Sequence, residues 1–256
     1  MRTTGTTTLT PKAWLHESPE DEERRRQQAF QKARRLSTTR RNTDIRERVT
    51  AATVRIDRHG AQGVLILGGY ILTAAHCVKW RRTRGMAMGE HHFERIKTQD
   101  GRKLITSVNA VEPVADIAAL GVVDNQISLE EADAFNLFAS DIQGIPIARK
   151  APRVGEFVPI QVLAHTKGWI VGVATRSGFP GASPGGTVCV QTDEPIRSGT
   201  SGGPVVDFDG RLIGVVSWSN ESDKSGNHLG AIPLAYFALP RWLTDHIRLN
   251  RQQRTD

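Results

Sequence analysis

The sequence is poor in cysteine and contains no long apolar run. Its 256 residues include two cysteines, Cys77 and Cys189. Two thiols in a chain of this size make neither a disulfide framework nor a paired-cysteine metal motif, so we expect both to be free, as is usual in a reducing compartment. The absence of an apolar run of about 18 residues argues against a membrane-spanning helix. Because residues 1–11 also lack the apolar core of a secretory signal, we expect a cytoplasmic location and no membrane contact.

The positive charge is concentrated at the N-terminus. The net charge is +7, and the first 50 residues carry 12 Lys/Arg against 7 Asp/Glu, whereas the remaining 206 carry 22 against 20. A folded body with so little excess charge argues against nucleic-acid binding. The basic charge belongs instead to an N-terminal extension, residues 1–48, where a protein partner would bind. A charged helix exposed to solvent explains the same composition.

A helix is predicted within this extension. Ser18 is a good N-cap, Pro19 suits the first helical position, and four acidic residues follow at 20–23, where the positive end of the helix dipole favours them. Basic residues then run to Arg35. Because the segment has few apolar side chains, we expect a helical or disordered arm that packs weakly and is dispensable for folding.

From Val49 onward the pattern changes to short apolar runs separated by Gly and Pro, which is typical of an all-β sandwich or barrel. A helix with capping-box spacing is predicted to start at Ser128 and to end near Phe138. A second, amphipathic helix is predicted over 240–248. The apolar runs are 52–56, 63–67, 70–74, 103–108, 117–123, 157–164, 169–175, 187–191, 204–208, 212–218 and 230–233.

Three separated segments carry the residues of a nucleophilic site. Ser201 lies among glycines, which let two backbone N–H groups point at one spot beside an exposed hydroxyl, as an oxyanion requires. His76 follows an apolar run and is a candidate base for the hydroxyl proton. Asp116 precedes a buried run and is a candidate for holding the imidazole tautomer. The three occur in the order His, Asp, Ser, which is the order known from chymotrypsin.

These segments resemble the three catalytic blocks of trypsin-like serine peptidases. The matching stretches are 70–78 (YILTAAHCV), 115–120 (ADIAAL) and 191–204 (QTDEPIRSGTSGGP), and 153–158 (RVGEFV) and 230–233 (GAIP) are similar to the HtrA/Deg branch. The resemblance covers roughly 49–236 and implies two six-stranded antiparallel β-barrels with the site between them. The expected divisions are an extension at 1–48, a first barrel at 49–125, a connecting segment at 126–149, a second barrel at 150–236, and a C-terminal helix and tail at 237–256.

The same resemblance implies the remaining site residues. The N–H groups of Gly199 and Ser201 would form the oxyanion hole, and Pro195 would form the floor of the pocket for the side chain before the cut. The residues implied to contact substrate are Pro195, Ile196, Ser217, Trp218, Ser219 and His228. A pocket whose floor carries no acid favours small or medium aliphatic side chains.

Two function classes follow from the sequence. The first is a serine endopeptidase acting on protein or peptide substrates. The second is a catalytically weak peptidase fold that binds a partner through residues 1–48. No cofactor or metal is expected, since residues 91–94 are interpreted as an exposed loop and 207–210 as a hairpin turn rather than metal ligands.

Overall fold

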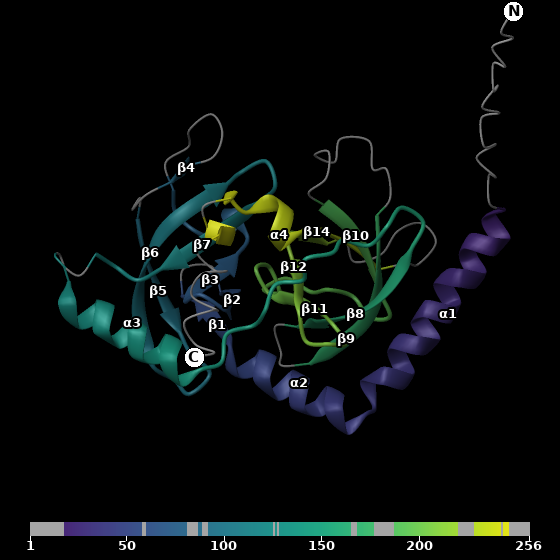
Figure 1. The fold of residues 1–256 in the computed structure, drawn as a ribbon, viewed down its shortest axis with the longest axis horizontal. Helices are drawn as coiled ribbons and strands as arrows, with labels where there is room; N and C mark the ends of the chain where they lie inside the picture. Colours follow the sequence, from purple (N-terminus) through teal and green to yellow (C-terminus); the bar gives the residue numbers. More distant parts are fainter. Residues whose placement is uncertain are drawn as a thin grey trace, which may run out of the picture.

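Short strands build two antiparallel β-sheets that lie side by side in a computed structural model (Figure 1). The structure describes residues 18–57, 60–80, 87–88, 92–124, 126, 128–164, 168–176, 187–219, 228–241 and 243–245. Within this part of the chain, no helix is both long enough and apolar enough to span a bilayer. Each sheet curls into a six-stranded barrel, so the predicted fold is confirmed.

The first barrel closes on itself through the pairing of β6 with β7. Its six main strands follow the order β6-β5-β1-β2-β3-β7, and the two-residue strand β4 lies at the edge of β6. Apolar side chains from these strands fill the interior. The strands are β1 (Thr53–Ile56), β2 (Ala61–Ile66), β3 (Tyr70–Thr73), β4 (Ala87–Met88), β5 (Phe93–Lys97), β6 (Lys103–Glu112) and β7 (Ile117–Gly121).

The second barrel has the order β12-β11-β8-β9-β10-β14, with the two-residue strand β13 paired to β14. A bridge between Gly214 and Leu234 joins its two ends. It has a separate apolar core. The strands are β8 (Phe157–Leu163), β9 (Trp169–Thr175), β10 (Thr187–Thr192), β11 (Pro204–Asp207), β12 (Leu212–Val215), β13 (Trp218–Ser219) and β14 (His228–Pro233).

A connecting segment links the barrels after helix α3 (Leu129–Asp141). Ile145 bridges to Ile66 of the first barrel, and Ile147 bridges to Leu212 of the second. The chain thus joins both sheets within three residues. After the second barrel, α4 (Ala235–Ala238) leads to a further helical turn. Leu243 is buried in this turn, as expected for the apolar side of the predicted C-terminal helix. Trp242 and Ile247, on the same predicted side, lie outside the described residues.

Two sequence-based expectations are wrong. Residues 93 and 94 are not an exposed loop but the start of β5, where Glu94 is 4% exposed and accepts a hydrogen bond from the Lys79 N–H. Its three charged residues, Glu94, Arg95 and Lys97, interrupt the apolar pattern from which the other strands are predicted. The N-terminal extension is also not weakly packed. It forms α1 (Pro19–Ser37) and α2 (Arg40–Ala51), and α1 lies along β8 and β9 (Figure 1).

The extension docks through small residues and polar contacts. Ala29 and Ala33 of α1 are buried, and Ile45 and Val49 of α2 join the core of the first barrel. The predicted cap of α1 is confirmed, since Ser18 Oγ accepts the Asp21 N–H. Small alanines allow a helix to lie close to a sheet with little apolar surface, which explains how so polar a segment packs.

A buried amide cluster holds α2 on the second barrel. Gln161 is 0% exposed, its Nε2 donates to Asn42 Oδ1 at 2.8 Å, and its Oε1 accepts from Arg46 Nε at 3.0 Å. The Arg46 guanidinium also lies over the Trp169 ring. Every polar atom of the Gln161 side chain therefore has a partner from α2.

We expect Asn42→Ala to lower the free energy of unfolding by about 1–3 kcal/mol, because it leaves the buried Gln161 amide without its acceptor. The matched control is Arg41→Ala on the same helix, which removes an exposed ion pair to Asp209 (2.9 Å) and should cost about 0–1 kcal/mol. Urea unfolding measures both. Equal losses would show that the amide cluster does not anchor the helix.

Candidate active site

His76 and Asp116 are brought together where the first barrel ends. His76 lies in a single 3-10 turn, η1 (Ala75–Cys77), directly after β3, and Asp116 lies just before β7, which pairs with β3. The His76 N–H donates to Asp116 Oδ1 at 2.9 Å, and His76 Nδ1 lies 2.7 Å from Asp116 Oδ2. Because a carboxylate only accepts, Nδ1 carries a proton and Nε2 is left to accept one.

The backbone of Asp116 is held in an uncommon conformation. Its φ is +56°, the only positive value for a non-glycine residue in the described part of the chain. This region is uncommon for any non-glycine residue, although Asp tolerates it better than most, and such conformations cost about 1–3 kcal/mol and cluster at functional sites. The turn aims the carboxylate at both the ring and the backbone of His76.

Ser217 is a third donor to the same carboxylate. Its Oγ donates to Asp116 Oδ2 at 2.6 Å, although the two residues are 101 positions apart and come from different barrels. The sequence suggested a substrate contact for Ser217, whereas the structure gives its hydroxyl this hydrogen bond. In the sequence, the position of Ser217 next to Trp218 and Ser219 is the one sign that it belongs to the site, and nothing there indicates a hydrogen bond to Asp116. The bond ties the acid to the second barrel.

The electrostatics of His76 follow from this pairing. The hydrogen bond to Asp116 is the largest cause that raises the pKa of His76 to about 10, with the Cys77 thiol as a second cause. An adjacent carboxylate favours the charged imidazolium. The His76 side chain is 49% exposed, so water reaches the ring. Cys77 itself is buried, and both cysteines are free, as predicted.

The loop around Ser201 crosses to the first barrel. The Ser201 carbonyl accepts the Gln62 N–H at 2.8 Å, and Gly202 N–H donates to the Val216 carbonyl at 2.7 Å. Gly202 has φ +76°, and a Cβ there would overlap the Gln62 carbonyl oxygen and Thr73 Oγ1. Only glycine permits this close approach, which brings the Ser201 loop against the strand that ends three residues before His76.

Two backbone N–H groups of this loop remain unused. Gly199 has φ +84°, and within the described residues neither the Gly199 N–H nor the Ser201 N–H donates to another group. The Thr200 N–H between them instead donates to the Arg197 carbonyl at 3.2 Å. Gln62 was not identified from the sequence. Its buried side chain places Nε2 3.4 Å from the Gly199 carbonyl, next to the predicted oxyanion hole.

The Ser201 hydroxyl is not hydrogen-bonded to the imidazole. Within the described residues, no hydrogen bond is formed by Ser201 Oγ, and His76 bonds through its Nδ1 side to Asp116. The structure therefore joins His76 with Asp116 and places the Ser201 loop against the same barrel. Within the described residues, it shows no hydrogen bond between the imidazole of His76 and the hydroxyl of Ser201.

The residues predicted to contact substrate lie together on the second barrel. Strand β13 pairs with β14, so that Ser219 faces Gly230, and Ser219 Oγ donates to the Ile196 carbonyl at 2.9 Å. The Ile196 side chain is 3% exposed and belongs to the barrel core, whereas Trp218 is 54% exposed. Pro195 is half-buried, and His228 begins β14 opposite Thr192. The Gly- and Pro-rich stretch 177–186 lies outside the described residues.

Comparison with known proteins identifies the class. The trypsin family model matches residues 38–239, so this chain belongs to the trypsin family of chymotrypsin-fold serine peptidases. The mitochondrial serine protease HTRA2 of Bos taurus is 32% identical over 164 residues. The match covers 61% of this chain and 31% of that protein, so the chain spans less than a third of the relative's length. The predicted family and its HtrA relationship are thus confirmed.

Solved structures agree with the fold. A crystal structure of the Rv3671c protease in an inactive form has a TM-score of 0.50 and 18% identity, and the match covers 76% of this chain and 88% of that one. A serine-to-alanine mutant of Rv3671c from M. tuberculosis H37Rv, also in an inactive form, matches with a TM-score of 0.50 and 16% identity over 76% and 86% of the two chains. At this identity, the likeness supports the double-barrel fold alone.

Proposed function

We propose that this chain is a serine endopeptidase that cuts peptide bonds through an acyl-enzyme, with Ser201 as nucleophile, His76 as general base and Asp116 as the residue that orients the imidazole. The observation that carries the proposal is the Asp116 carboxylate, which accepts from the His76 N–H and lies against His76 Nδ1. This arrangement leaves His76 Nε2 as the free basic nitrogen.

The proposed reaction moves one proton back and forth. Ser201 Oγ attacks the peptide carbonyl carbon while His76 Nε2 takes the hydroxyl proton. The N–H groups of Gly199 and Ser201 donate to the resulting oxyanion. The C–N bond then breaks as the imidazolium gives the proton to the leaving amine. Water, deprotonated by His76, attacks the acyl carbon and releases the acid and the Ser201 hydroxyl.

The unmade contact between Ser201 and His76 is the observation that favours the alternative function, a catalytically weak module that binds a partner. Hydrogen bonds between base and nucleophile are often long without substrate and tighten in the substrate complex. A binding module also has no need of an ordered His76–Asp116 pair, a strained aspartate or two unused amides. These features together support the enzyme.

Substrate recognition follows from the same barrel. We propose that the substrate backbone adds as a strand alongside 217–219, where Trp218 is exposed. Pro195 offers no acid to the pocket, and Glu194 is exposed rather than turned inward. An unpaired Lys or Arg would be costly to bury there. Small or medium aliphatic residues such as Val, Ala and Leu should therefore precede the cut.

Cleavage of a peptide library, with cut sites identified by mass spectrometry, tests this preference. We expect Val, Ala and Leu before the cut, with Lys and Arg disfavoured. A dominant Lys/Arg signal would contradict the pocket assignment and point to Glu194. A dominant Glu signal would contradict it as well and would point to His228 as the residue that pairs with an acidic side chain in the pocket.

The rise of activity with pH is also expected to be centred above the usual pKa range of histidine. The base must be neutral to accept the Ser201 proton, and the Asp116 carboxylate raises the pKa of His76 to about 10. The acid limb of the kcat/KM profile should therefore lie above pH ~6.5, the ordinary histidine value. Its midpoint is read from initial rates across pH. A midpoint at or below the ordinary value would show that Asp116 does not hold the imidazolium in solution.

A further inference from the structure

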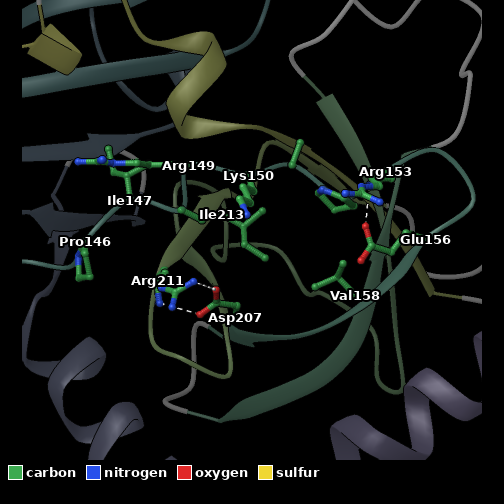
Figure 2. Close-up of a pocket in the computed structure, with 13 residues that line it drawn as sticks. Pro146, Ile147, Arg149, Lys150, Arg153, Glu156, Val158, Asp207, Arg211 and Ile213 are labelled. Carbon is green, nitrogen blue, oxygen red and sulfur yellow. Dashed lines mark hydrogen bonds and ion pairs between the residues drawn. The ribbon is translucent and has the colours of Figure 1, made fainter.

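A groove opens on the second barrel beside the connecting segment (Figure 2). Its volume is about 800 Å³, and it shares no lining residue with the His76, Asp116 and Ser201 segments. Apolar side chains of Ile147, Val158 and Ile213 line it.

Cations outnumber carboxylates around this groove. Arg149, Lys150, Arg153 and Arg211 line it, against the two acids Asp207 and Glu156. Figure 2 shows Lys150 between the Arg211–Asp207 ion pair and the hydrogen bond from the Arg153 backbone N–H to Glu156 in that view. Three of the four cations come from one short stretch, 149–153, of the connecting segment.

The two carboxylates are already engaged. Asp207 Oδ1 accepts the backbone N–H groups of Asp209 and Arg211, each at 2.9 Å. Glu156 Oε2 accepts the backbone N–H of Arg153 at 2.8 Å. Within the described residues, the side chains of Arg149, Lys150 and Arg153 have no ion-pair partner, and all three residues are exposed. The groove therefore offers unpaired positive charge beside apolar surface.

The backbone bordering the groove bends at Arg149 and has N–H groups that are open within the described residues. The Ala148 N–H donates to the Leu212 carbonyl at 2.8 Å, which is the last contact of this segment with β12. Beyond it, no hydrogen bond is made by the N–H groups of Arg149, Lys150 or Ala151 within the described part of the chain. Such a segment can exchange backbone hydrogen bonds with an extended chain.

We propose that this groove binds an extended acidic peptide segment of a partner protein, whose apolar side chains alternate with Asp or Glu. In an extended chain, alternate side chains point to opposite faces, so one set meets Ile147, Val158 and Ile213 while the other reaches Lys150 and Arg153. A small-anion site would instead converge several N–H groups on one point. A nucleic-acid phosphate chain is disfavoured, because its backbone offers no apolar side chains to Ile147, Val158 and Ile213.

Fluorescence anisotropy on full-length Ser201→Ala protein tests the proposal with a short labelled peptide of alternating Glu and Val. The variant is Lys150→Glu/Arg153→Glu. The matched control is Arg95→Glu/Lys97→Glu, which reverses two exposed cations of β5 on the other barrel with the same change in net charge. We expect the groove variant to weaken binding about tenfold or more, because it reverses two charges that line the groove, and the control to change binding by less than about threefold, because Arg95 and Lys97 do not line it.

Four outcomes would overturn the proposal. These are no binding of the Glu-Val peptide, equal weakening by the two variants, equal binding of a peptide with Gln in place of Glu, and equal binding of a DNA oligonucleotide of the same charge. Because the test uses the Ser201→Ala protein and measures binding only, its failure leaves the peptidase proposal standing. Conversely, a wild-type protein without peptidase activity would leave the outcome of the binding measurement unchanged.

Discussion

Ser201→Ala is expected to lower kcat for peptide hydrolysis by about 10⁶-fold, because it removes the atom proposed to attack the carbonyl. The Ser201 hydroxyl makes no hydrogen bond within the described residues, so its loss should leave the unfolding curve in urea unchanged. Ser198→Ala is the matched control. Ser198 is an exposed serine of the same loop, and its replacement should leave kcat close to the wild-type value.

Steady-state kinetics with a fluorogenic peptide that has Val before the cut measures both variants. Wild-type activity in Ser201→Ala would remove this residue from the mechanism. A similar loss in Ser198→Ala would show that the loop, rather than the hydroxyl, is sensitive to change.

Asp116→Asn is expected to lower kcat by about 10⁴-fold, the size seen for the same change in a related triad. The amide of Asn would donate toward His76 Nδ1, so the ring would place its proton on Nε2, the nitrogen that must accept. The substitution would also weaken the acceptor of the 2.6 Å hydrogen bond from Ser217. The backbone conformation at φ +56° is one that Asn tolerates, so the fold should survive.

Asp100→Asn is the control for this change. Asp100 is an exposed acid of the first barrel that pairs with Arg102 at 2.9 Å, and its neutralisation should leave kcat unchanged. A large loss in Asp100→Asn with normal activity in Asp116→Asn would reverse the assignment of the orienting acid. Circular dichroism confirms that both variants are folded.

Most of the strands could be predicted because each apolar run contains at most one charged residue. The run at 117–123 became β7, and the run at 169–175 coincides with β9. Strand β5 was missed because Glu94, Arg95 and Lys97 break the apolar pattern. Its one buried charge, Glu94, is stabilised by the backbone N–H of Lys79, which lies 15 residues away. A partner at that distance is not visible in the local sequence.

The docking of the N-terminal helices could not be predicted for a related reason. Their contacts depend on arginines and amides, which the sequence alone suggests are solvated. Arg25 donates to the Gly155 carbonyl at 2.6 Å, and Asn42 and Arg46 saturate the Gln161 side chain. These bonds join residues more than 100 positions apart, and only the folded barrel brings them into range.

In the candidate site, the residue types and their order could be predicted, but the connections between them could not. Motifs singled out His76, Asp116 and Ser201, and the structure places the first two within hydrogen-bonding distance. The Ser217–Asp116 hydrogen bond and the Gln62 contact with the Ser201 loop cross between barrels. Sequence spacing carries no information on such contacts, because they depend on how the two barrels are oriented.

Labelling with a fluorophosphonate probe tests the central claim most directly, because the probe reacts only with a serine activated by a base beside an oxyanion hole. The full-length protein is incubated with the probe and digested, and the modified peptide is sequenced by mass spectrometry. We expect wild-type protein to be labelled at Ser201, Ser201→Ala to remain unlabelled, and Asp116→Asn to react far more slowly. Wild-type protein that is folded but unlabelled, or labelled at another serine, would contradict the proposed mechanism.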